Sequence, residues 1–299
     1  MTVVGNKRSV QTARYGLNVP TSTHGTDPVA LAGRVEELGF DFLSINDHLH
    51  GDRPTYETWT LLTWLAARTA RIGLVTRVLG VPYRAPAVVA KMAESLDRLS
   101  DGRLTLGLGG GSSDEEFRAF GLGDFTPRQK VDGMHDAITI ARGLWSGEPF
   151  SYEGRRYRTR AARLTPGAQR HIPIWLGTYG PRALAITGRQ ADGWIPSYGF
   201  VGASELVRMR GTMRAAAERA GRDPDAIMCV LNLEIRLDST AAPTDDMVAG
   251  STSSVLDQLG HLTALGFPNF NFIPAGSDVS DQIEVLAREI LPELRSATP

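Results

Sequence analysis

The sequence predicts an α/β protein of the (β/α)8 TIM-barrel class, and three observations support this prediction. Short apolar runs rich in β-branched residues alternate with longer segments of helical periodicity along the chain. Eight such pairs of strand and helix can be counted, and no low-complexity linker divides them. Alternation of this kind implies parallel strands joined by right-handed crossovers, and eight units favour a closed barrel over an open doubly wound sheet.

The predicted strands are short and are bounded by glycine, proline or polar residues. The eight are Tyr15 to Pro20, Phe42 to Asp47, Ile72 to Leu79, Leu104 to Gly109, Ile174 to Gly177, Trp194 to Pro196, Met228 to Leu237 and Asn269 to Pro274.

The predicted helices carry apolar residues at helical spacing, and several begin with proline, which suits the first helical position. The third, for example, begins at Pro86 and presents Val88, Met92, Leu96 and Leu99 on one face. The others cover Pro28 to Leu38, Trp59 to Ala67, Arg128 to Leu144, Pro181 to Gln190, Ser204 to Ala217, Val255 to Leu265 and Gln282 to Leu291.

One stretch does not fit the alternation. Trp145 to Ile172 precedes the fifth strand, is rich in arginine and glycine, and is too long for a simple loop. Its segment GEPFSYEGRRYRTR predicts a short hairpin packed on the barrel surface. We therefore expect a single domain over residues 1–299, with Trp145 to Ile172 as an insertion.

The composition excludes several classes of protein. The 299 residues include 32 Lys and Arg against 33 Asp and Glu, so the field of the whole protein gives no reason to expect nucleic acid or an anionic membrane as partner. The single cysteine, Cys229, excludes an internal disulfide and fits a reducing cytosol. The N-terminus lacks the apolar core of a signal peptide, and no stretch reaches the roughly 20 apolar residues of a membrane span. We expect a cytoplasmic protein that recognises a small-molecule substrate through a local site.

A barrel carries its chemistry at the C-terminal ends of its strands and in the loops that follow them. Candidate positions for the site follow from the predicted strands alone. They are Asn18, Asp47 and His48, Thr76 to Gly80, Gly109 to Asp114, and Gly177 to Arg182.

The fourth predicted strand ends in the glycine-rich segment Leu106 to Gly111, LGLGGG. As a dinucleotide-binding turn it fails the G-x-G-x-x-G pattern, because the third position is Ser112 counted from Gly107 and Asp114 counted from Gly109. Two interpretations stay open. Either the glycines let the backbone approach a flat ligand over the barrel mouth, or the strand needs small residues to close the barrel.

A second glycine segment, Gly177-Thr178-Tyr179-Gly180-Pro181-Arg182, lies between a predicted strand and a predicted helix. Free backbone N–H groups and the positive end of the helix dipole there would hold a phosphate. The hydroxyls of Thr178 and Tyr179 and the guanidinium of Arg182 would be available to help. A phosphate site is favoured, and a plain tight turn is the alternative.

The segment Asp47-His48-Leu49-His50 follows the second strand. An H-x-H pair at a strand end begins the metal site of some hydrolases, but the other histidines do not follow strands, so we expect no metal site. We interpret His48 as a proton donor or hydrogen-bond partner to a bound cofactor, beside a carboxylate that can fix its tautomer. A histidine with a structural role at the barrel rim is the alternative. No G-x-S-x-G elbow supports a serine nucleophile.

Four segments carry a family resemblance: RYGLNVP, AGRVEELGFDFLSINDH, RAPAVVAKMAESLDRLSDGRLTLGLGGGSSDEEFRAFG and PIWLGTYGPRALAITGRQADGWIP. In them the chain resembles the bacterial luciferase-like monooxygenase superfamily, especially its deazaflavin-dependent oxidoreductase branch. They cover most of residues 14–196 in family order, whereas the C-terminal third resembles the family mainly in its pattern of elements. The resemblance implies a barrel that binds FMN or coenzyme F420 across its C-terminal mouth, where the cofactor supplies the redox chemistry.

The resemblance also implies roles for residues of this chain. Asp47 and His48 look like the Asp-His pair of the deazaflavin branch, in which the histidine lies near the reactive part of the ring. Thr76 and Arg77 match the place where the family often has a bulge with a non-prolyl cis peptide. The glycines after the fourth strand would edge the ring, and Gly177 to Ala183 would hold the phosphate. The residues so implied in cofactor binding are Asp47, His48, Thr76, Arg77, Gly110, Gly111, Gly177, Thr178, Tyr179, Gly180, Pro181, Arg182 and Ala183.

Two positions depart from the sugar-phosphate-oxidising members of the family. Ser112 stands where these have an acidic residue, and Asp52 stands where they have a tryptophan. The departures argue against sugar-phosphate dehydrogenation. The substrate would be selected by loops at the mouth, such as His50 to Tyr56, Ser112 to Phe125 and Ser197 to Gly202.

The leading hypothesis is therefore an oxidoreductase that transfers a hydride between coenzyme F420 and a small organic substrate, with His48 as the catalytic proton-handling residue. An FMN-dependent monooxygenase that uses O2 and reduced flavin from a partner flavin reductase is the alternative. A third hypothesis is a non-catalytic barrel that binds a flavin or scaffolds a partner. A homodimer is expected from the resemblance alone.

Overall fold

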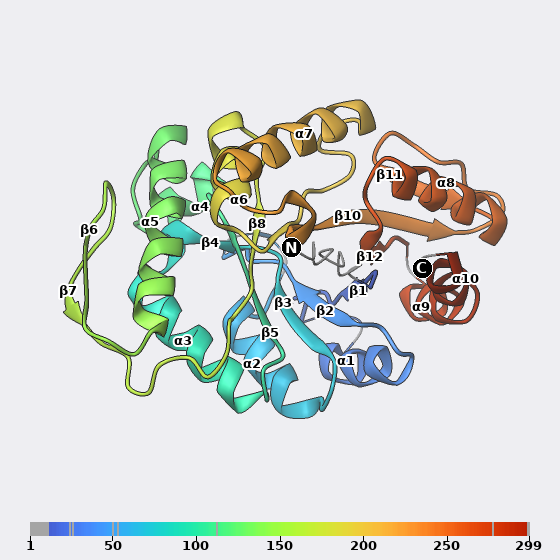
Figure 1. Ribbon diagram of the computed structural model, residues 1–299. Coiled ribbons are helices and arrows are strands. Elements are labelled where there is room, and N and C mark those ends of the chain that lie inside the picture. The colour runs from blue at the N-terminus through green and yellow to red at the C-terminus, as the bar shows by residue number, and fades with distance from the viewer. Residues whose placement is uncertain are drawn as a thin grey trace, which may run out of the picture.

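The barrel predicted from the sequence is present in the computed structural model, which describes residues 12–297 other than His24, Thr26, His50, Arg53, Ser112 and Ser277. Within this part of the chain eight parallel strands form a closed ring, in which the last strand pairs with the first (Figure 1). In order around the ring they are β1 (Tyr15–Asn18), β2 (Phe42–Ile45), β3 (Gly73–Thr76), β5 (Leu104–Gly109), β8 (Ile174–Gly177), β9 (Gly193–Trp194), β10 (Met228–Leu237) and β12 (Asn269–Pro274).

Helices cover the outside of this ring, and the predicted fold class is confirmed (Figure 1). Each barrel helix turns an apolar face to the strands, so the core forms a continuous layer between strands and helices. The helices are α1 (Pro28–Glu37), α2 (Thr58–Arg68), α3 (Pro86–Leu99), α5 (Pro127–Trp145), α6 (Pro181–Gln190), α7 (Ala203–Arg219), α8 (Thr252–Ala264), α9 (Val279–Val285) and α10 (Leu291–Ala297), with a π-helical turn at Leu286–Ile290 between the last two.

The third predicted strand is divided in the structure. It consists of β3, then a bend, then the two-residue strand β4 (Leu79–Gly80), which pairs with β5 beyond the end of β3. The peptide bond between Arg77 and Val78, inside this bend, is cis. The resemblance places a cis peptide in this region, and the structure has it there. The bend brings Arg77 and Val78 to the mouth of the barrel.

The prediction of which residues form the buried apolar face of α3 is partly wrong. Val88 and Leu99 are exposed, at 55% and 80%. The alanines of the true inner face let α3 lie close to α5, where Nε1 of Trp145 donates a hydrogen bond of 2.9 Å to the carbonyl oxygen of Ala90. That face is turned by one residue from the prediction and includes Val89, Ala90, Ala93 and Leu96.

The insertion before β8 contains the predicted hairpin. Strands β6 (Phe150–Glu153) and β7 (Arg158–Ala162) pair antiparallel beside α5, outside the barrel (Figure 1). Asp136 of α5, which is 1% exposed, anchors them: it accepts hydrogen bonds from the Tyr152 hydroxyl at 2.9 Å and from the backbone N–H of Arg156 at 2.7 Å. A buried carboxylate thereby fixes the hairpin on the barrel surface.

Two elements were not predicted from the sequence, the short helix α4 (Asp114–Ala119) and the strand β11 (Met247–Gly250), which extends the sheet beyond β10. None of the helices in the described part of the chain combines the length and hydropathy that a membrane crossing requires. The expectation that the N-terminus carries no signal peptide concerns mainly residues 1–11, which lie outside the described residues.

Close approach of β5 to the bend explains two of its glycines. A Cβ atom on Gly107 would lie 1.8 Å from the carbonyl oxygen of Thr76, and a Cβ atom on Gly109 would lie 2.6 Å from Cγ2 of Val78. At these two positions the structure supports the interpretation that the strand needs small residues to close the barrel.

We predict that Gly107→Ala lowers the free energy of unfolding by about 2 kcal/mol or more, because the added methyl group meets backbone that cannot move without opening the barrel. The measurement is urea denaturation followed by circular dichroism. Gly211→Ala is the matched control: it lies in α7 with no atom within 4 Å of the added Cβ, so helix propensity should raise stability by about 0.5–1 kcal/mol. Equal stability of Gly107→Ala and wild type would contradict the prediction.

Candidate active site

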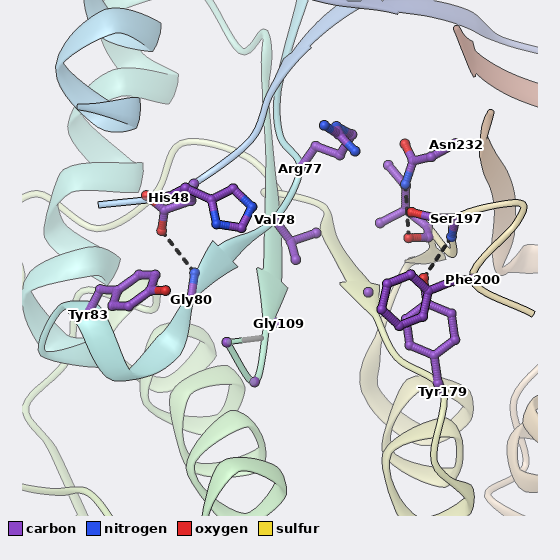
Figure 2. A pocket seen from close by; sticks show the side chains of 15 residues that line it. His48, Arg77, Val78, Gly80, Tyr83, Gly109, Tyr179, Ser197, Phe200 and Asn232 are labelled. Carbon is purple, nitrogen blue, oxygen red and sulfur yellow. Dashed lines mark hydrogen bonds between the residues drawn. The ribbon is translucent and has the colours of Figure 1, made fainter. Parts of the chain in front are cut away.

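A cavity of about 410 Å³ opens where the barrel strands end (Figure 2). It is bounded on one side by residues that follow β2, β4 and β5, and on the other by residues that follow β8 and β9. Its lining residues are Asp47, His48, Arg77, Val78, Gly80, Tyr83, Gly109, Gly110, Gly111, Gly177, Tyr179, Ile195, Ser197, Phe200 and Asn232.

Asp47 forms the base of one wall. Its buried carboxylate accepts two hydrogen bonds from the Arg84 guanidinium, at 2.8 and 3.0 Å, and one from the backbone N–H of Gly80 at 3.0 Å. Burial by itself lowers the pKa of Arg84, but the hydrogen bonds to Asp47 and Glu57 outweigh it and raise the pKa above its usual value. Asp47 is therefore not the carboxylate that fixes the tautomer of His48, because Arg84 and Gly80 occupy its oxygens.

Glu116 is the carboxylate that bonds to His48. Its Oε1 lies 2.8 Å from Nδ1 of His48, and its other oxygen accepts a short hydrogen bond from the hydroxyl of Tyr83. An ionised carboxylate only accepts, so the proton between the two groups lies on Nδ1. In the neutral ring Nε2 then carries a lone pair, on a side chain that is 52% exposed at the cavity.

Burial and hydrogen bonding act in opposite directions on Glu116. Burial would raise its pKa, but the hydrogen bonds from Tyr83 and His48 outweigh this and lower the pKa below its usual value. Burial and the bond to Glu116 together raise the pKa of Tyr83 well above its usual value. At neutral pH the pair is therefore an ionised carboxylate and a protonated phenol, and the carboxylate can stabilise a positive charge on His48.

The glycines after β5 differ from one another. Gly111 has a φ of +76°, and a Cβ atom there would also lie 2.4 Å from the Phe117 ring, so backbone geometry and packing both favour glycine. A Cβ atom on Gly110 would meet only Cβ of Lys130, at 3.3 Å. This contact is tighter than ordinary van der Waals contact, so a side chain at this position would displace Lys130; Gly110 itself lines the cavity, as the interpretation of an approaching flat ligand requires.

The segment after β8 has the helix N-terminus that was predicted, but only one of the two predicted hydroxyls. Gly180 is the N-cap of α6, and no side chain caps the helix, so N–H groups of the first turn are left to a ligand. The Thr178 hydroxyl is buried 2.8 Å from that of Thr187, so the prediction that it is available is wrong. The Tyr179 hydroxyl accepts a hydrogen bond from the Ser197 backbone at 2.8 Å, and this bond does not use its own proton.

The remaining residues of this segment divide between the cavity and the surface. Gly177 and Tyr179 line the cavity, whereas Thr178, Pro181, Arg182 and Ala183 do not. The Arg182 guanidinium donates to Asp132 at 2.8 Å and is 53% exposed. An anion at the helix terminus would have to compete with Asp132 for this side chain.

Thr76 and Arg77 point in different directions. Thr76 is fully buried outside the cavity lining, where its hydroxyl exchanges hydrogen bonds of 2.8 Å with both backbone groups of Gly107. A contact between the Thr76 side chain and a cofactor is therefore ruled out. Arg77 lines the cavity and donates from Nε to Oδ1 of Asn18 at 2.9 Å.

Several cavity residues were missed by sequence reasoning. The pattern Ser113-x-x-Glu116 has the form of a helix capping box, and Ser113 does cap α4 by accepting from the Glu116 backbone at 3.2 Å. The Glu116 side chain turns instead to His48, which lies 68 residues earlier in the chain. Ser197 and Phe200 lie in a loop that was expected to shape the substrate site, while Asn232, in the middle of β10, carried no signal.

Among the described residues no group of three or more His, Cys, Asp or Glu side chains is arranged to hold a metal ion. His50, the second histidine of the H-x-H pair, and His24 lie outside the described residues. The same holds for Ser112, one of the two departures from the sugar-phosphate-oxidising members, whereas Asp52 lies exposed in the loop after β2.

Comparisons with known proteins agree with this architecture. A family model described as luciferase-like monooxygenase matches residues 10–265. An F420-dependent glucose-6-phosphate dehydrogenase of Nakamurella multipartita is 31% identical over 234 residues, which cover 76% of this chain and 68% of that protein. An F420-dependent hydroxymycolic acid dehydrogenase of Mycobacterium tuberculosis is 32% identical over 205 residues, which cover 67% of this chain and 56% of that protein.

Solved structures with the same fold include an F420-dependent secondary alcohol dehydrogenase in complex with an F420-acetone adduct, with a TM-score of 0.85 at 17% identity. That match covers 95% of this chain and 99% of the other. The coenzyme F420-dependent tetrahydromethanopterin reductase of Methanopyrus kandleri has a TM-score of 0.83 at 19% identity, over 95% of this chain and 100% of the other. At these identities the likeness concerns the fold.

We predict that Glu116→Gln destabilises the protein by about 1–2 kcal/mol at neutral pH and less in acid. A carboxylate with a pKa lowered by folding stabilises the fold above its unfolded pKa, near 4.3, and the stabilisation is lost as pH falls through the folded value. Urea denaturation at several pH values between about 3 and 7 measures the difference. Glu218→Gln, at an exposed position of α7, should change stability little throughout. A difference for Glu116→Gln that does not vary with pH would contradict the prediction.

Proposed function

The chain belongs to the luciferase-like monooxygenase family, and from this premise we propose that it is an oxidoreductase that transfers a hydride between coenzyme F420 and a small organic substrate. The observation that carries the proposal is His48, held through Nδ1 by a buried carboxylate at the edge of a cavity on the barrel mouth. The relatives named above use F420, which favours it over FMN.

The residues present fit a flat ring that bears a phosphate. Gly109, Gly110 and Gly177 line the cavity without side chains of their own, which leaves room for a ring there. The uncapped first turn of α6, at Gly180 and the residues that follow, suits a phosphate. In this proposal Gly110, Gly111, Gly177 and Tyr179 border the ring, while Gly180, Pro181, Arg182 and Ala183 surround the phosphate.

Bound F420 would supply the hydride-transfer chemistry. The protein has to handle the accompanying proton, since an alcohol that loses a hydride from carbon also loses the proton of its hydroxyl. Nε2 of His48 is the acceptor for that proton, and in the reverse direction the same atom returns it. Glu116 acts through His48: it keeps the first proton on Nδ1 and stabilises the imidazolium that forms.

The proposal includes a homodimer that pairs through α2. Trp64 of this helix is 59% exposed and Tyr56, just before it, is 45% exposed. They line an apolar hollow together with Trp59 and the start of α1. Large exposed aromatic rings around one hollow are typical of interaction surfaces. The proposal also includes a cytoplasmic location, in keeping with the single cysteine, Cys229, which is buried in β10.

We predict that the purified protein binds F420 in a fluorescence titration and that His48→Ala still binds it. Removal of the proton acceptor should lower kcat by about 10²–10⁴-fold with any substrate found by screening alcohols, aldehydes and activated alkenes. His261→Ala, at an exposed position of α8, is the matched control and should retain wild-type turnover.

Other outcomes would separate the alternatives. Tight binding of FMN without binding of F420, together with substrate-dependent consumption of O2, would replace the proposal with an FMN-dependent monooxygenase. Full turnover by His48→Ala would remove His48 from the mechanism. No turnover with any substrate or cofactor would favour the non-catalytic barrel.

We predict that the wild-type protein elutes as a dimer in size-exclusion chromatography with light scattering, and that Trp64→Glu elutes as a monomer at the same concentration. A carboxylate in the centre of an apolar contact would be buried without a partner. Val207→Glu, on α7, should leave the dimer intact, because Val207 lies on another helix and is 39% exposed. A monomeric wild type, or a dimeric Trp64→Glu variant, would overturn this part of the proposal.

A further inference from the structure

Arg77 brings a positive charge into the cavity without a matching negative one. Its Nε donates to Asn18, but in the part of the chain that the structure describes its two terminal nitrogens have no hydrogen-bond acceptor and no carboxylate forms an ion pair with it. Arg84, the other arginine near the cavity, is bound by both oxygens of Asp47. The two side chains therefore differ in function: Arg84 is neutralised within the protein, and Arg77 is left for a ligand.

The surroundings of Arg77 disfavour an isolated charge. Burial lowers its pKa to about 10, although Tyr179 and Glu234 act in the opposite direction. With that pKa the guanidinium is still protonated at neutral pH. A charge that has lost part of its water without gaining a counter-ion is unfavourable, and an anion that enters the cavity would relieve this.

The polar side chains inside the barrel supply no negative charge to Arg77. Nδ2 of Asn271 donates to Oδ1 of Asn232 at 2.8 Å, and the Ser44 hydroxyl donates to Oδ1 of Asn271 at 2.9 Å. Oδ1 of Asn18 accepts from Arg77 itself. These partners are neutral amides and a hydroxyl, so they hydrogen-bond to one another and to Arg77 without balancing its charge.

The cavity also has apolar lining. The rings of Tyr179 and Phe200 stack with centroids 5.1 Å apart and planes at 29°, and Ile195 and Val78 line the same cavity. The Tyr179 hydroxyl is directed to the Ser197 backbone, as the dashed line in Figure 2 shows. A ligand in this cavity therefore meets both a positive charge and apolar side chains.

We propose that Arg77 binds an anionic group of the substrate, a carboxylate or a phosphate ester, while the apolar body of the substrate packs against Phe200 and Ile195. The planar fork of a guanidinium pairs with either group through two parallel hydrogen bonds. The inference rests on the proposed function, since it names the substrate class of the same site. Arg77 and His48 both line this cavity (Figure 2), so a substrate bound to Arg77 would occupy the same cavity as His48.

The test uses the full chain without cofactor and three small probes: benzoate, phenyl phosphate and benzyl alcohol. Binding is measured by isothermal titration calorimetry or saturation-transfer NMR. We expect benzoate, phenyl phosphate or both to bind the wild type at least about tenfold more tightly than benzyl alcohol, because hydrogen bonds to a charged group are strong. The carboxylate and phosphate probes distinguish the two sources of the negative charge.

In Arg77→Gln the preference for the anion should fall to less than about twofold. Arg77→Lys keeps the charge but not the fork, so it should keep a reduced preference, and it replaces Arg77→Gln if that variant does not fold. Arg236→Gln removes the same charge from β10, where the guanidinium is already paired with Asp278 and Asp238, and should keep the full preference.

Equal binding of the anionic and neutral probes by the wild type would overturn the inference, as would a preference that survives in Arg77→Gln. The F420 titration is run on the same variants. A large loss of F420 binding in Arg77→Gln, with the anion preference unchanged, would assign Arg77 to the cofactor and overturn the inference. A wild type that prefers anions through Arg77 but binds no F420 would refute the proposed function and leave the anion subsite standing.

Discussion

The close approach of β5 to the bend between β3 and β4 is the constraint on which the site depends. Gly107 lies against the backbone of Thr76, and Gly109 lies against Val78, so the bend can fold over the end of the barrel instead of continuing as a strand. The Thr76 hydroxyl bonds to both backbone groups of Gly107 and holds the two segments together. This packing brings Arg77 to the cavity, which Gly110 also lines just beyond the close contact.

The two carboxylates near His48, those of Asp47 and Glu116, have different partners and different roles. Asp47 is neutralised by Arg84 and fixes the start of the segment after β4, through the Gly80 backbone. Among the residues that the structure describes, no arginine pairs with Glu116; Tyr83 and His48 bond to it, so its negative charge is available to the imidazole. A carboxylate that is fully ion-paired would do little to stabilise a positive charge on a neighbouring histidine. The contact of His48 with Glu116, and not with Asp47, therefore supports the proposed role of His48 in proton transfer.

The sequence predicts the parts of this structure that depend on local patterns. Four of the eight barrel strands have the predicted bounds, because runs such as Leu104–Gly109 and Asn269–Pro274 end at residues that cannot extend them. Contacts between distant segments were the part that failed. The Thr178 hydroxyl was expected at a ligand but bonds to Thr187, and Glu116 was not singled out because its partner His48 lies 68 residues earlier in the chain. Side-chain direction at such positions is set by tertiary packing, which no spacing rule encodes.

The near-zero net charge acquires a specific meaning from the site. With 32 basic and 33 acidic residues the protein exerts no strong long-range field, so charge recognition has to arise from groups whose partners are missing locally. Most arginines of the described chain, among them Arg84, Arg142, Arg170 and Arg236, are bound by carboxylates. Arg77 and the uncapped first turn of α6 are left over at the barrel mouth, one inside the cavity and one beside it. Two positive sites at one opening can take two different anions, so the proposed phosphate-bearing cofactor and the proposed anionic substrate would not compete for one residue.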